Sequence, residues 1–492
     1  MKRPFKVLVL SVTISIIPCI VMSQHFGQKS HEIHSGVDNM KIMKYWDTNT
    51  EGNIKIYEAI DKVLSTTKNA SYADVLENED YIKLRDKYKI KLLGGPMLGN
   101  VKYDGVAIWI RTAKPSKVHV EVNDSTKTIK SISITTSTET DLAGVIKIDN
   151  LKSNTTYSYK VVVDGEVISN EDYAFTTSSN LQQSSNTRIV FGSCPHRWGL
   201  GNVKLFETIK ERKPNAMFLL GDIVVQDRDN HLGKHRADHQ FRDLQTAWSD
   251  FASSVPVYAN WDDHDYFGND KSGIPKGFTD QDRRHVRQVF KNNWANPDYG
   301  LNGEGIFFKT QIGSAEVVMT DNRYFREDDK GVFLGEKQMD WLKSQIKNCK
   351  SPFLVISCGT MWSDYVSNGK DSWGGVDPEG RKELFKLIEE NKVSAVILIS
   401  GDRHGARGFT INTKSGFKLY EFEAASLGAR VGPPKSKPEW TSQLYGIDGT
   451  FAFGELTFDT TCKDPKMTFR LIDEEGNIIK EITESHSELT SK

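Results

Sequence analysis

The sequence predicts an α/β protein made of several consecutive regions. Its 492 residues are too many for one compact core, so length alone indicates about two to four domains. The spacing of apolar residues changes along the chain, from helical periodicity, to short strands with turn signals, to apolar strands that alternate with helical patterns. The formal net charge of -1 provides no basic field, so we expect no nucleic acid among the partners.

A signal peptide is expected at residues 1–23. Lys2, Arg3 and Lys6 precede an apolar stretch that ends near Ser23, where small residues fit a cleavage site. A membrane anchor is the alternative, but the stretch is short for one. We therefore expect a secreted or periplasmic protein with no stable membrane insertion after cleavage. Four cysteines would remain, and export permits disulfides whose pairing the sequence does not define.

Residues 24–94 are expected to form a helical segment, because apolar residues from Ile54 to Leu64 and from Tyr81 to Leu92 recur at helical spacing. Residues 95–178 are expected to form an all-β domain. Lys-Pro, Asn-Asp-Ser and Asp-Gly turn signals separate its strands, which are expected at residues 106–110, 118–122, 144–148 and 157–163. The run 151–159 resembles the corner before a strand in fibronectin type III-like modules, which implies a β-sandwich.

A polar linker at residues 178–187 leads into a larger domain, expected at residues 188–480. Apolar strands alternate there with helical patterns, which predicts a mixed or parallel sheet covered by helices. Strands are expected at residues 189–191, 216–220, 255–259, 317–319, 353–356 and 396–399. Ligands gather beyond the carboxyl ends of the strands in such sheets, so the residues that follow them are the candidates for a site.

Four of these strands are followed by residues that can bind metal. Cys194, Asp222, Asp263-His264 and Asp402-x-His404 each come shortly after an apolar run. Thiolate, carboxylate and imidazole are the ligand types of a transition-metal site. Each run alone has an ordinary explanation, such as a buried inert cysteine or a solvated acidic turn. Four such strand ends together predict a metal centre.

The motifs around these residues resemble the PhoD-like alkaline phosphatase D family, a branch of the calcineurin-like metallophosphoesterases. The matching runs are Phe191-Gly192-Ser193-Cys194, Leu220-Gly221-Asp222, Trp261-Asp262-Asp263-His264-Asp265, Thr320-Asp321-Asn322-Arg323, Asp371-Ser372-Trp373 and Ser400-Gly401-Asp402-Arg403-His404. The resemblance covers residues 95–480. It implies a metallophosphoesterase-type mixed β-sandwich flanked by helices, preceded by the fibronectin III-like domain and the helical segment.

The resemblance also implies a set of metal ligands. Cys194 is similar to the family's thiolate ligand to iron, and Asp222 to the carboxylate shared between metals. Asp263, Asp402 and His404 match further ligand positions. The family pairs iron with calcium, which suits a thiolate beside hard oxygen ligands.

One ligand of the family is missing from this sequence. The family supplies a tyrosine between the Gly-Asp and Trp-Asp-Asp-His runs, whereas residues 235–244 contain Phe241 and His239 but no tyrosine. Either His239 substitutes, or water fills the position, or the metal differs. Zinc, ferrous iron and manganese therefore stand beside ferric iron as expectations.

The implied reaction is the hydrolysis of phosphate monoesters by a metal-activated hydroxide. We expect His264 to give a proton to the leaving oxygen or to hold the phosphoryl group. We expect Arg323 to bind phosphate through its guanidinium fork, with an ordinary salt bridge as the alternative. The family also includes phosphodiesterases and phospholipase D-like enzymes. Two other classes remain: a surface binding protein with a degenerate metal site, and an enzyme that uses Cys194 as a thiol nucleophile. Oligomeric state is left open.

Overall fold

The structure is a computed structural model that describes residues 38–491, except residues 169–172, 364–370, 394, 414, 425, 429–439 and 448. The signal peptide expected at residues 1–23 lies outside the described residues. Within the described ranges, we find no helix with the length and apolar character needed to cross a bilayer.

Helices come first in the described chain. They are α2 (Asn39–Tyr45), α3 (Glu51–Leu64), α4 (Tyr72–Glu77) and α5 (Glu79–Lys87). The side chains of Asp38, Thr50, Ser71 and Asn78 cap their N-termini, which satisfies backbone N–H groups there. The expected helical segment extended to residue 94, but the last helix ends at Lys87 and Leu92 already belongs to the first strand.

Two antiparallel sheets follow and face each other across one apolar core. One contains β1 (Leu92–Gly99), β2 (Gly105–Thr112) and β6 (Ala143–Asp149). The other contains β3 (Lys117–Asn123), β4 (Thr128–Lys130), β5 (Ile134–Thr135), β7 (Thr156–Val163), β8 (Glu166–Val167) and β9 (Ala174–Thr176), and the 3-10 helix η1 (Thr138–Thr140) lies between β5 and β6. Ile108, Val120 and Val161 are buried between the sheets. The four expected strands fall within β2, β3, β6 and β7, while the likeness to fibronectin III stays a prediction.

The larger region contains two more sheets. The first has the order β12-β11-β10-β20-β21-β22. Its strands are β10 (Asn186–Gly192), β11 (Ala216–Leu220), β12 (Val257–Asn260), β20 (Ala452–Asp459), β21 (Lys466–Asp473) and β22 (Ile478–Ser485). Strands β10, β11 and β12 are parallel neighbours, so their carboxyl ends lie side by side.

The second sheet has the order β13-β14-β15-β16-β18-β17-β19. Its strands are β13 (Phe308–Ile312), β14 (Ala315–Met319), β15 (Phe353–Ser357), β16 (Val396–Ser400), β17 (Ala406–Asn412), β18 (Lys418–Glu423) and β19 (Gln443–Ile447). Strands β14, β15 and β16 are parallel. Phe218 of the first sheet and Val317 and Ile397 of the second share one buried cluster, so the two sheets pack face to face.

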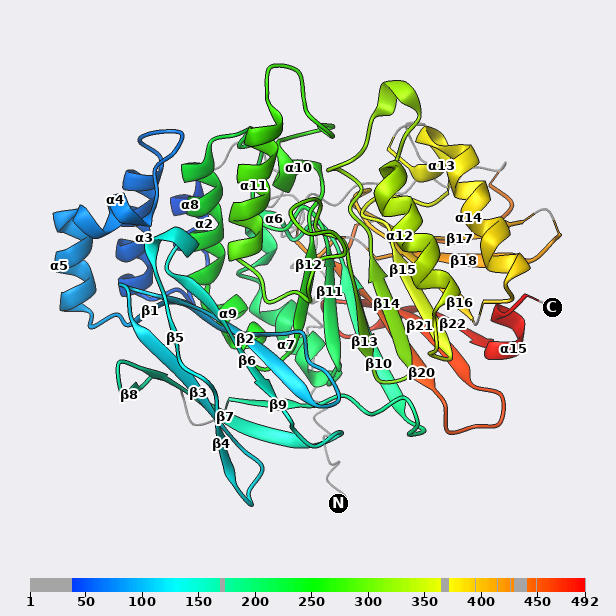
Figure 1. The fold of residues 1–492 in the computed structure, drawn as a ribbon, viewed down its shortest axis with the longest axis horizontal. Helices are drawn as coiled ribbons and strands as arrows, with labels where there is room; N and C mark the ends of the chain where they lie inside the picture. Colours follow the sequence, from blue (N-terminus) through cyan, green and yellow to red (C-terminus); the bar gives the residue numbers. More distant parts are fainter. Residues whose placement is uncertain are drawn as a thin grey trace, which may run out of the picture.

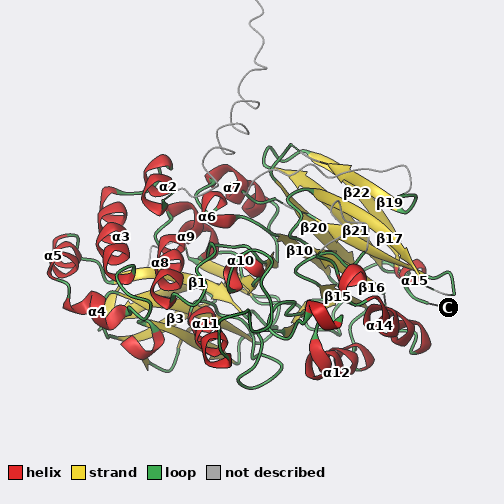
Figure 2. Ribbon diagram, turned by 90° about the horizontal axis from the view of Figure 1, so that it is seen from above, coloured by secondary structure: helices red, strands yellow, loops and turns green. Residues whose placement is uncertain are grey.

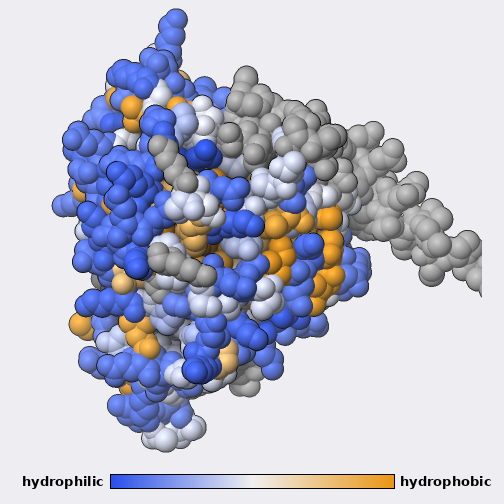
Figure 3. All heavy atoms as spheres, turned by 90° about the vertical axis from the view of Figure 1, so that its right-hand side faces the viewer, coloured by the Kyte–Doolittle hydropathy of each residue, from blue (hydrophilic) through white to orange (hydrophobic). Residues whose placement is uncertain are grey.

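Helices cover the outer sides of this pair of sheets (Figures 1 and 2). Beside the first sheet lie α6 (His196–Gly199), α7 (Val203–Glu211), α8 (Leu232–Asp243), α9 (Thr246–Ala252), α10 (Asp263–Tyr266) and α11 (Asp280–Asn292). Beside the second lie α12 (Gly335–Lys347), α13 (Trp373–Val376) and α14 (Pro378–Glu390), with the 3-10 helix η2 (Asp328–Lys330) before them. The chain ends near α15 (His486–Leu489). Figure 3 shows that the face nearest α14 and α15 is largely hydrophilic.

Two expectations for this region need correction. No helical pattern was assigned between β11 and β13, where the structure has α8 to α11. Beyond residue 402, the described chain contains strands β17 to β22 and the short α15, where alternation with helices was expected through residue 480. The helical pattern of α8 is hidden because many of its buried side chains are polar and meet polar partners, such as Asn39 on Asp238. The described cysteines, Cys194, Cys349, Cys358 and Cys462, are all free thiols.

Candidate metal centre

The loops after β10, β11, β12 and β16 meet at one edge of the paired sheets. Cys194 follows β10, Asp222 follows β11, Asp263 follows β12 and Asp402 follows β16. The backbone N–H of Cys194 donates to the carbonyl of Gly221 over 3.0 Å, which joins the first two loops. The backbone N–H of Asp402 donates to Ser193 Oγ over 3.1 Å, which joins the loop of the second sheet to the loop of the first.

The predicted ligands fall into two groups that share Asp222. Potential ligand atoms lie within 4.8 Å of one another in the group Cys194, His196, Asp222 and His404, and again in the group Asp222, Asp262, Asp263 and Asp402. A third group joins His264 to Asp222 and Asp263. The five predicted metal ligands are therefore brought together, and His264 lies beside them. Sequence reasoning left out His196 and Asp262.

The backbone at these positions is unusual. Positive φ angles occur at Cys194 (55°), His196 (42°), Asp222 (52°), Asp402 (74°) and His404 (49°). Non-glycine residues rarely adopt this conformation, and each costs on the order of 1–3 kcal/mol, so such residues cluster at functional sites. The surrounding structure therefore holds these five side chains in place against a local conformational cost.

Glycines let the ligand loops touch directly. A Cβ added at Gly221 would lie 2.5 Å from the Cβ of Asp262, and one added at Gly401 would lie 2.6 Å from the Cβ of Ser193. Real Cβ atoms do not approach so closely, so larger residues at these two positions would push the loops apart. The glycines of the two Gly-Asp dipeptides, Gly221 and Gly401, therefore allow the loops to pack closely as well as to turn.

The acidic residues of the site are buried at a high electrostatic cost. Burial raises the pKa of Asp222 well above its usual value, Asp263 and Asp262 raise it further, and His264 opposes the rise. Burial also raises the pKa of Asp262 to about 8 and that of Asp402 to about 6. Asp222 Oδ1 and Asp262 Oδ2 are buried with no hydrogen-bond partner among the described residues. Buried carboxylates with unsatisfied oxygens are stabilised by a bound cation, so the donor set fits metal ions.

Cys194 has the same need for a cation. Burial raises the pKa of its thiol well above the usual range, and Asp222 and Asp402 raise it further. Burial and the two carboxylates therefore oppose formation of a free reactive thiolate, whereas metal binding deprotonates a coordinating thiol. This environment disfavours the thiol-nucleophile alternative.

Acidic neighbours raise the pKa of His264. Burial lowers this pKa, but the charge of Asp222 and the hydrogen bond to Asp227 outweigh burial and raise it to about 11. His264 Nδ1 lies 2.8 Å from Asp227 Oδ1 and 2.9 Å from Gln226 Nε2. One acceptor and one donor therefore face Nδ1 and hold the ring in place.

Arg323 lies behind the acidic residues and is fully buried. Its Nε donates to Asp262 Oδ1 over 2.5 Å, and its Nη2 donates to Asp371 Oδ2 over 2.8 Å. Arg326 Nη1 donates to the other oxygen of Asp371 over 2.5 Å. These contacts favour a role for Arg323 in charge balance within the site. Its direct contact with phosphate stays a prediction.

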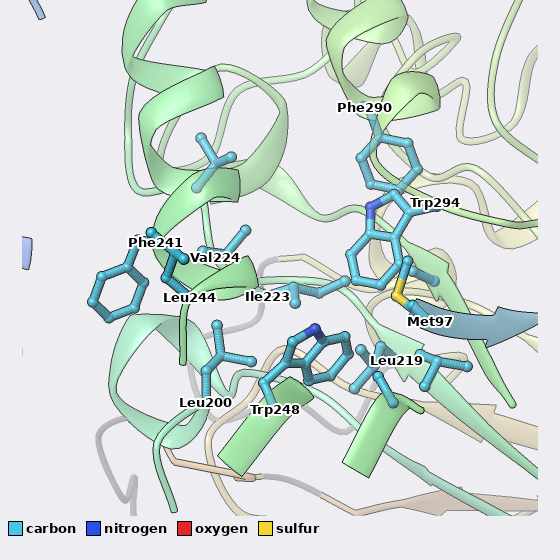
Figure 4. Close-up of a cluster of buried hydrophobic side chains, with 14 of the residues drawn as sticks. Met97, Leu200, Leu219, Ile223, Val224, Phe241, Leu244, Trp248, Phe290 and Trp294 are labelled. Atoms are coloured by element: carbon cyan, nitrogen blue, oxygen red, sulfur yellow. The ribbon is translucent and has the colours of Figure 1, made fainter. Parts of the chain in front are cut away.

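His239 does not replace the missing tyrosine. The ring of His239 faces Phe290 and Trp294, with centroid distances of 6.5 and 6.4 Å. Phe241 packs against Tyr57 at 5.8 Å and belongs to the apolar cluster shown in Figure 4. Within the described residues, no group of potential ligands includes His239, so the structure does not support its substitution for the tyrosine.

Comparisons with known proteins agree with this arrangement. The family model described as PhoD-like phosphatase matches residues 189–469. The chain belongs to the PhoD-like phosphatase family. It is therefore a phosphoric ester hydrolase. A second family model, a domain of unknown function (DUF7800), matches residues 89–180 of this PhoD-like phosphatase.

Solved structures share the fold of this PhoD-like phosphatase. A structure of PhoD aligns with a TM-score of 0.65 and 17% identity, covering 80% of this chain and 88% of the other. A purple acid phosphatase, PPD1 from yellow lupin (Lupinus luteus) seeds, aligns with a TM-score of 0.61 and 16% identity, covering 80% and 75%. At this identity the likeness establishes the fold alone. No curated protein matches significantly.

Proposed function

We propose that this PhoD-like phosphatase is an exported enzyme that hydrolyses phosphate monoesters at a centre of two metal ions. The observation that carries the proposal is the sharing of Asp222 between two groups of potential ligands. A carboxylate shared in this way is the arrangement that two-metal hydrolysis of phosphate esters needs. In a binding protein with a degenerate metal site, burial of this unsatisfied carboxylate would cost stability with no cation to offset it.

The residues divide into two ligand sets. Cys194, Asp222 and His404 would hold one ion, and Asp222, Asp263 and Asp402 the other. Bound ions supply an activated water and neutralise the charge of the phosphate oxygens. Iron and calcium are the metals expected from the family, with zinc or manganese as alternatives.

His264 acts as the general acid. Asp227, which is outside the proposed ligand sets, orients the ring through Nδ1 and favours its protonated form. It therefore donates its remaining N–H proton to the leaving alkoxide. Arg323 keeps Asp262 and Asp371 in place behind the ligands and balances their charge.

The substrate class is tested with two synthetic esters. We expect a higher kcat/KM for a nitrophenyl phosphate monoester than for the bis-nitrophenyl diester. A preference for the diester would assign the enzyme to the phosphodiesterases, and release of head group from phosphatidylcholine vesicles would assign it to the phospholipase D-like members. A chelator should stop hydrolysis while iodoacetamide should not, because the proposed reaction needs metal and no free thiol.

Export is tested by the N-terminus of the mature protein. We expect a chain that begins near residue 24 and is recovered from the periplasm or the medium. A cytoplasmic chain that keeps its first residues would contradict the proposed export and would leave the proposed chemistry untouched.

A further inference from the structure

We propose that His196 replaces the missing tyrosine ligand, so that one ion is held by Cys194, His196, Asp222 and His404. The inference rests on the proposed metal centre and deepens it, because it names a ligand and a class of ion. The ion at this position is then divalent and borderline-soft, such as zinc or ferrous iron.

The distances are those of a single coordination shell. His196 Nε2 lies 3.4 Å from His404 Nε2 and 4.0 Å from Asp222 Oδ2. Cys194 Sγ lies 3.8 Å from the same oxygen of Asp222. In a tetrahedral site with metal–nitrogen distances of about 2.0–2.1 Å, the nitrogen ligands lie roughly 3.3 Å apart. The two imidazoles therefore already have the separation that a shared ion would impose.

Gln226 fixes which nitrogen of His196 can bind. His196 Nδ1 lies 2.8 Å from Gln226 Oε1, and an amide oxygen only accepts, so Nδ1 carries the hydrogen. The amide of Gln226 is oriented by its other end, where Nε2 donates to Asp227 Oδ2 over 3.2 Å and lies 2.9 Å from His264 Nδ1. The lone pair of His196 is thus on Nε2, the atom that faces His404. Metal-binding histidines commonly donate their second N–H to such an oxygen.

The backbone aims His196 at the site. Cys194 and His196 both have positive φ, one on either side of Pro195. The backbone N–H of His196 donates to the carbonyl of Asp222 over 3.0 Å, which ties the turn to the next ligand loop. His196 is 8% exposed. A strained, buried turn that brings a thiol and an imidazole together is expected where both bind the same metal ion.

The donor set selects the charge of the ion. One thiolate, one carboxylate and two neutral imidazoles supply two negative charges, which balance a divalent ion within this shell. Sulfur and imidazole ligands suit zinc and ferrous iron. Without a phenolate, the centre also lacks the phenolate-to-ferric charge transfer that colours an iron–tyrosinate site.

The test measures metal content and spectra of the purified holoenzyme and of cobalt-substituted protein. We expect wild type to be colourless and to contain zinc or ferrous iron. His196→Ala should lose one equivalent of metal and change the visible cobalt bands, while His285→Ala, an exposed position on α11, should do neither. Gln226→Leu should weaken binding of that ion by about 10–100-fold, because it removes the acceptor that orients His196. Melting curves of the metal-free proteins select variants that fold.

Two results would overturn the inference. One is a folded His196→Ala protein with full metal content and an unchanged cobalt spectrum. The other is stoichiometric ferric iron in the wild-type protein. Wild type that binds the ion through His196 yet cleaves no phosphate ester would instead contradict the proposed function, so the two failures are distinguishable.

Discussion

At the scale of single residues, Asp222 is the carboxylate on which the candidate centre depends. It belongs to three of the potential ligand groups, it is 1% exposed, and one of its oxygens has no hydrogen-bond partner among the described residues. Removing its charge therefore affects both proposed ions at once.

Asp222→Asn should reduce the content of both metals and lower phosphate ester hydrolysis by more than about 100-fold, the upper range for residues that merely support a ligand. Elemental analysis and steady-state rates measure the two effects. Asp250→Asn, at an exposed position on α9, is the control and should change neither. Full metal content in Asp222→Asn would contradict the shared-carboxylate arrangement.

His235 is a second residue with a measurable consequence, because it is buried neutral away from the ligands. Burial lowers the pKa of His235 to about 4 from its usual 6.5, and its Nε2 lies 2.8 Å from the carbonyl of Asp229. In the unfolded chain, His235 binds a proton below about pH 6.5. In the folded chain it stays neutral until about pH 4. His235 therefore contributes stability above pH 6.5 that is lost as the pH falls.

The expected loss from His235 is up to about 1.4 kcal/mol per pH unit below pH 6.5. His235→Gln keeps a donor for Asp229 but does not titrate, so the free energy of unfolding of this variant should fall less between pH 7 and pH 5 than that of wild type. Denaturant titrations at the two pH values provide the comparison, with His285→Gln as the exposed control. Equal pH dependence in His235→Gln and wild type would count against a buried neutral His235.

At the scale of elements, one buried arginine joins the β-sheet pair to the α/β region. Arg111 of β2 donates through Nη1 to Asp243 of α8 over 2.5 Å and through Nη2 to Asn293 after α11, also over 2.5 Å. Its Nε donates to the carbonyl of Asp141 over 3.1 Å. The contact connects three separate parts of the chain at a fully buried position.

Arg111→Met should destabilise the protein by about 3 kcal/mol, because the buried Asp243 loses the partner of Oδ2 while Arg242 still pairs with Oδ1. Lys147→Met is the matched control, since Lys147 and Asp298 form an exposed pair at 3.7 Å and such pairs contribute about 0–1 kcal/mol. Thermal unfolding of both variants measures the difference. Similar small effects for the two would contradict a structural role for Arg111.

The strands and helices also show why only part of the fold and of the site could be predicted from the sequence. Strands such as β11 and β16 were predicted because they are short, continuous apolar runs that end in polar residues. The convergence of Cys194, Asp222 and Asp402 followed from the general rule about carboxyl ends of parallel strands. Helix α8 was missed because its buried face is polar. From the sequence, His196 could be interpreted as a residue that supports the ligands, and it was left out of the ligand set, although the Cys-x-His spacing on one turn could have indicated a ligand.

At the scale of the whole molecule, the centre lies where the two large sheets meet. Cys194, Asp222 and Asp263 follow strands of one sheet, whereas Asp402 and His404 follow β16 of the other. Without cations, the carboxylates at this edge repel one another in a buried place, so the metal-free protein should be less stable than the loaded one.

Removal of metal by a chelator should lower the unfolding temperature, and adding the ion back should restore it. A free ion at 100 times its Kd contributes about 2.7 kcal/mol to the folded state. Differential scanning calorimetry measures the shift. Asp222→Asn should show a much smaller shift on chelation, and an unchanged melting curve for stripped wild type would contradict metal binding at this edge.

The position of these ligands on two different sheets has a consequence for the lifetime of the protein. The described chain contains no disulfide, so a bound ion would provide a cross-link between layers of the kind that extracellular proteins often obtain from cystine. In the proposed exported enzyme, loss of metal would both stop hydrolysis and leave this edge of the sheets open to proteolysis. The amount of enzyme that persists would then follow the supply of metal, with no separate regulator.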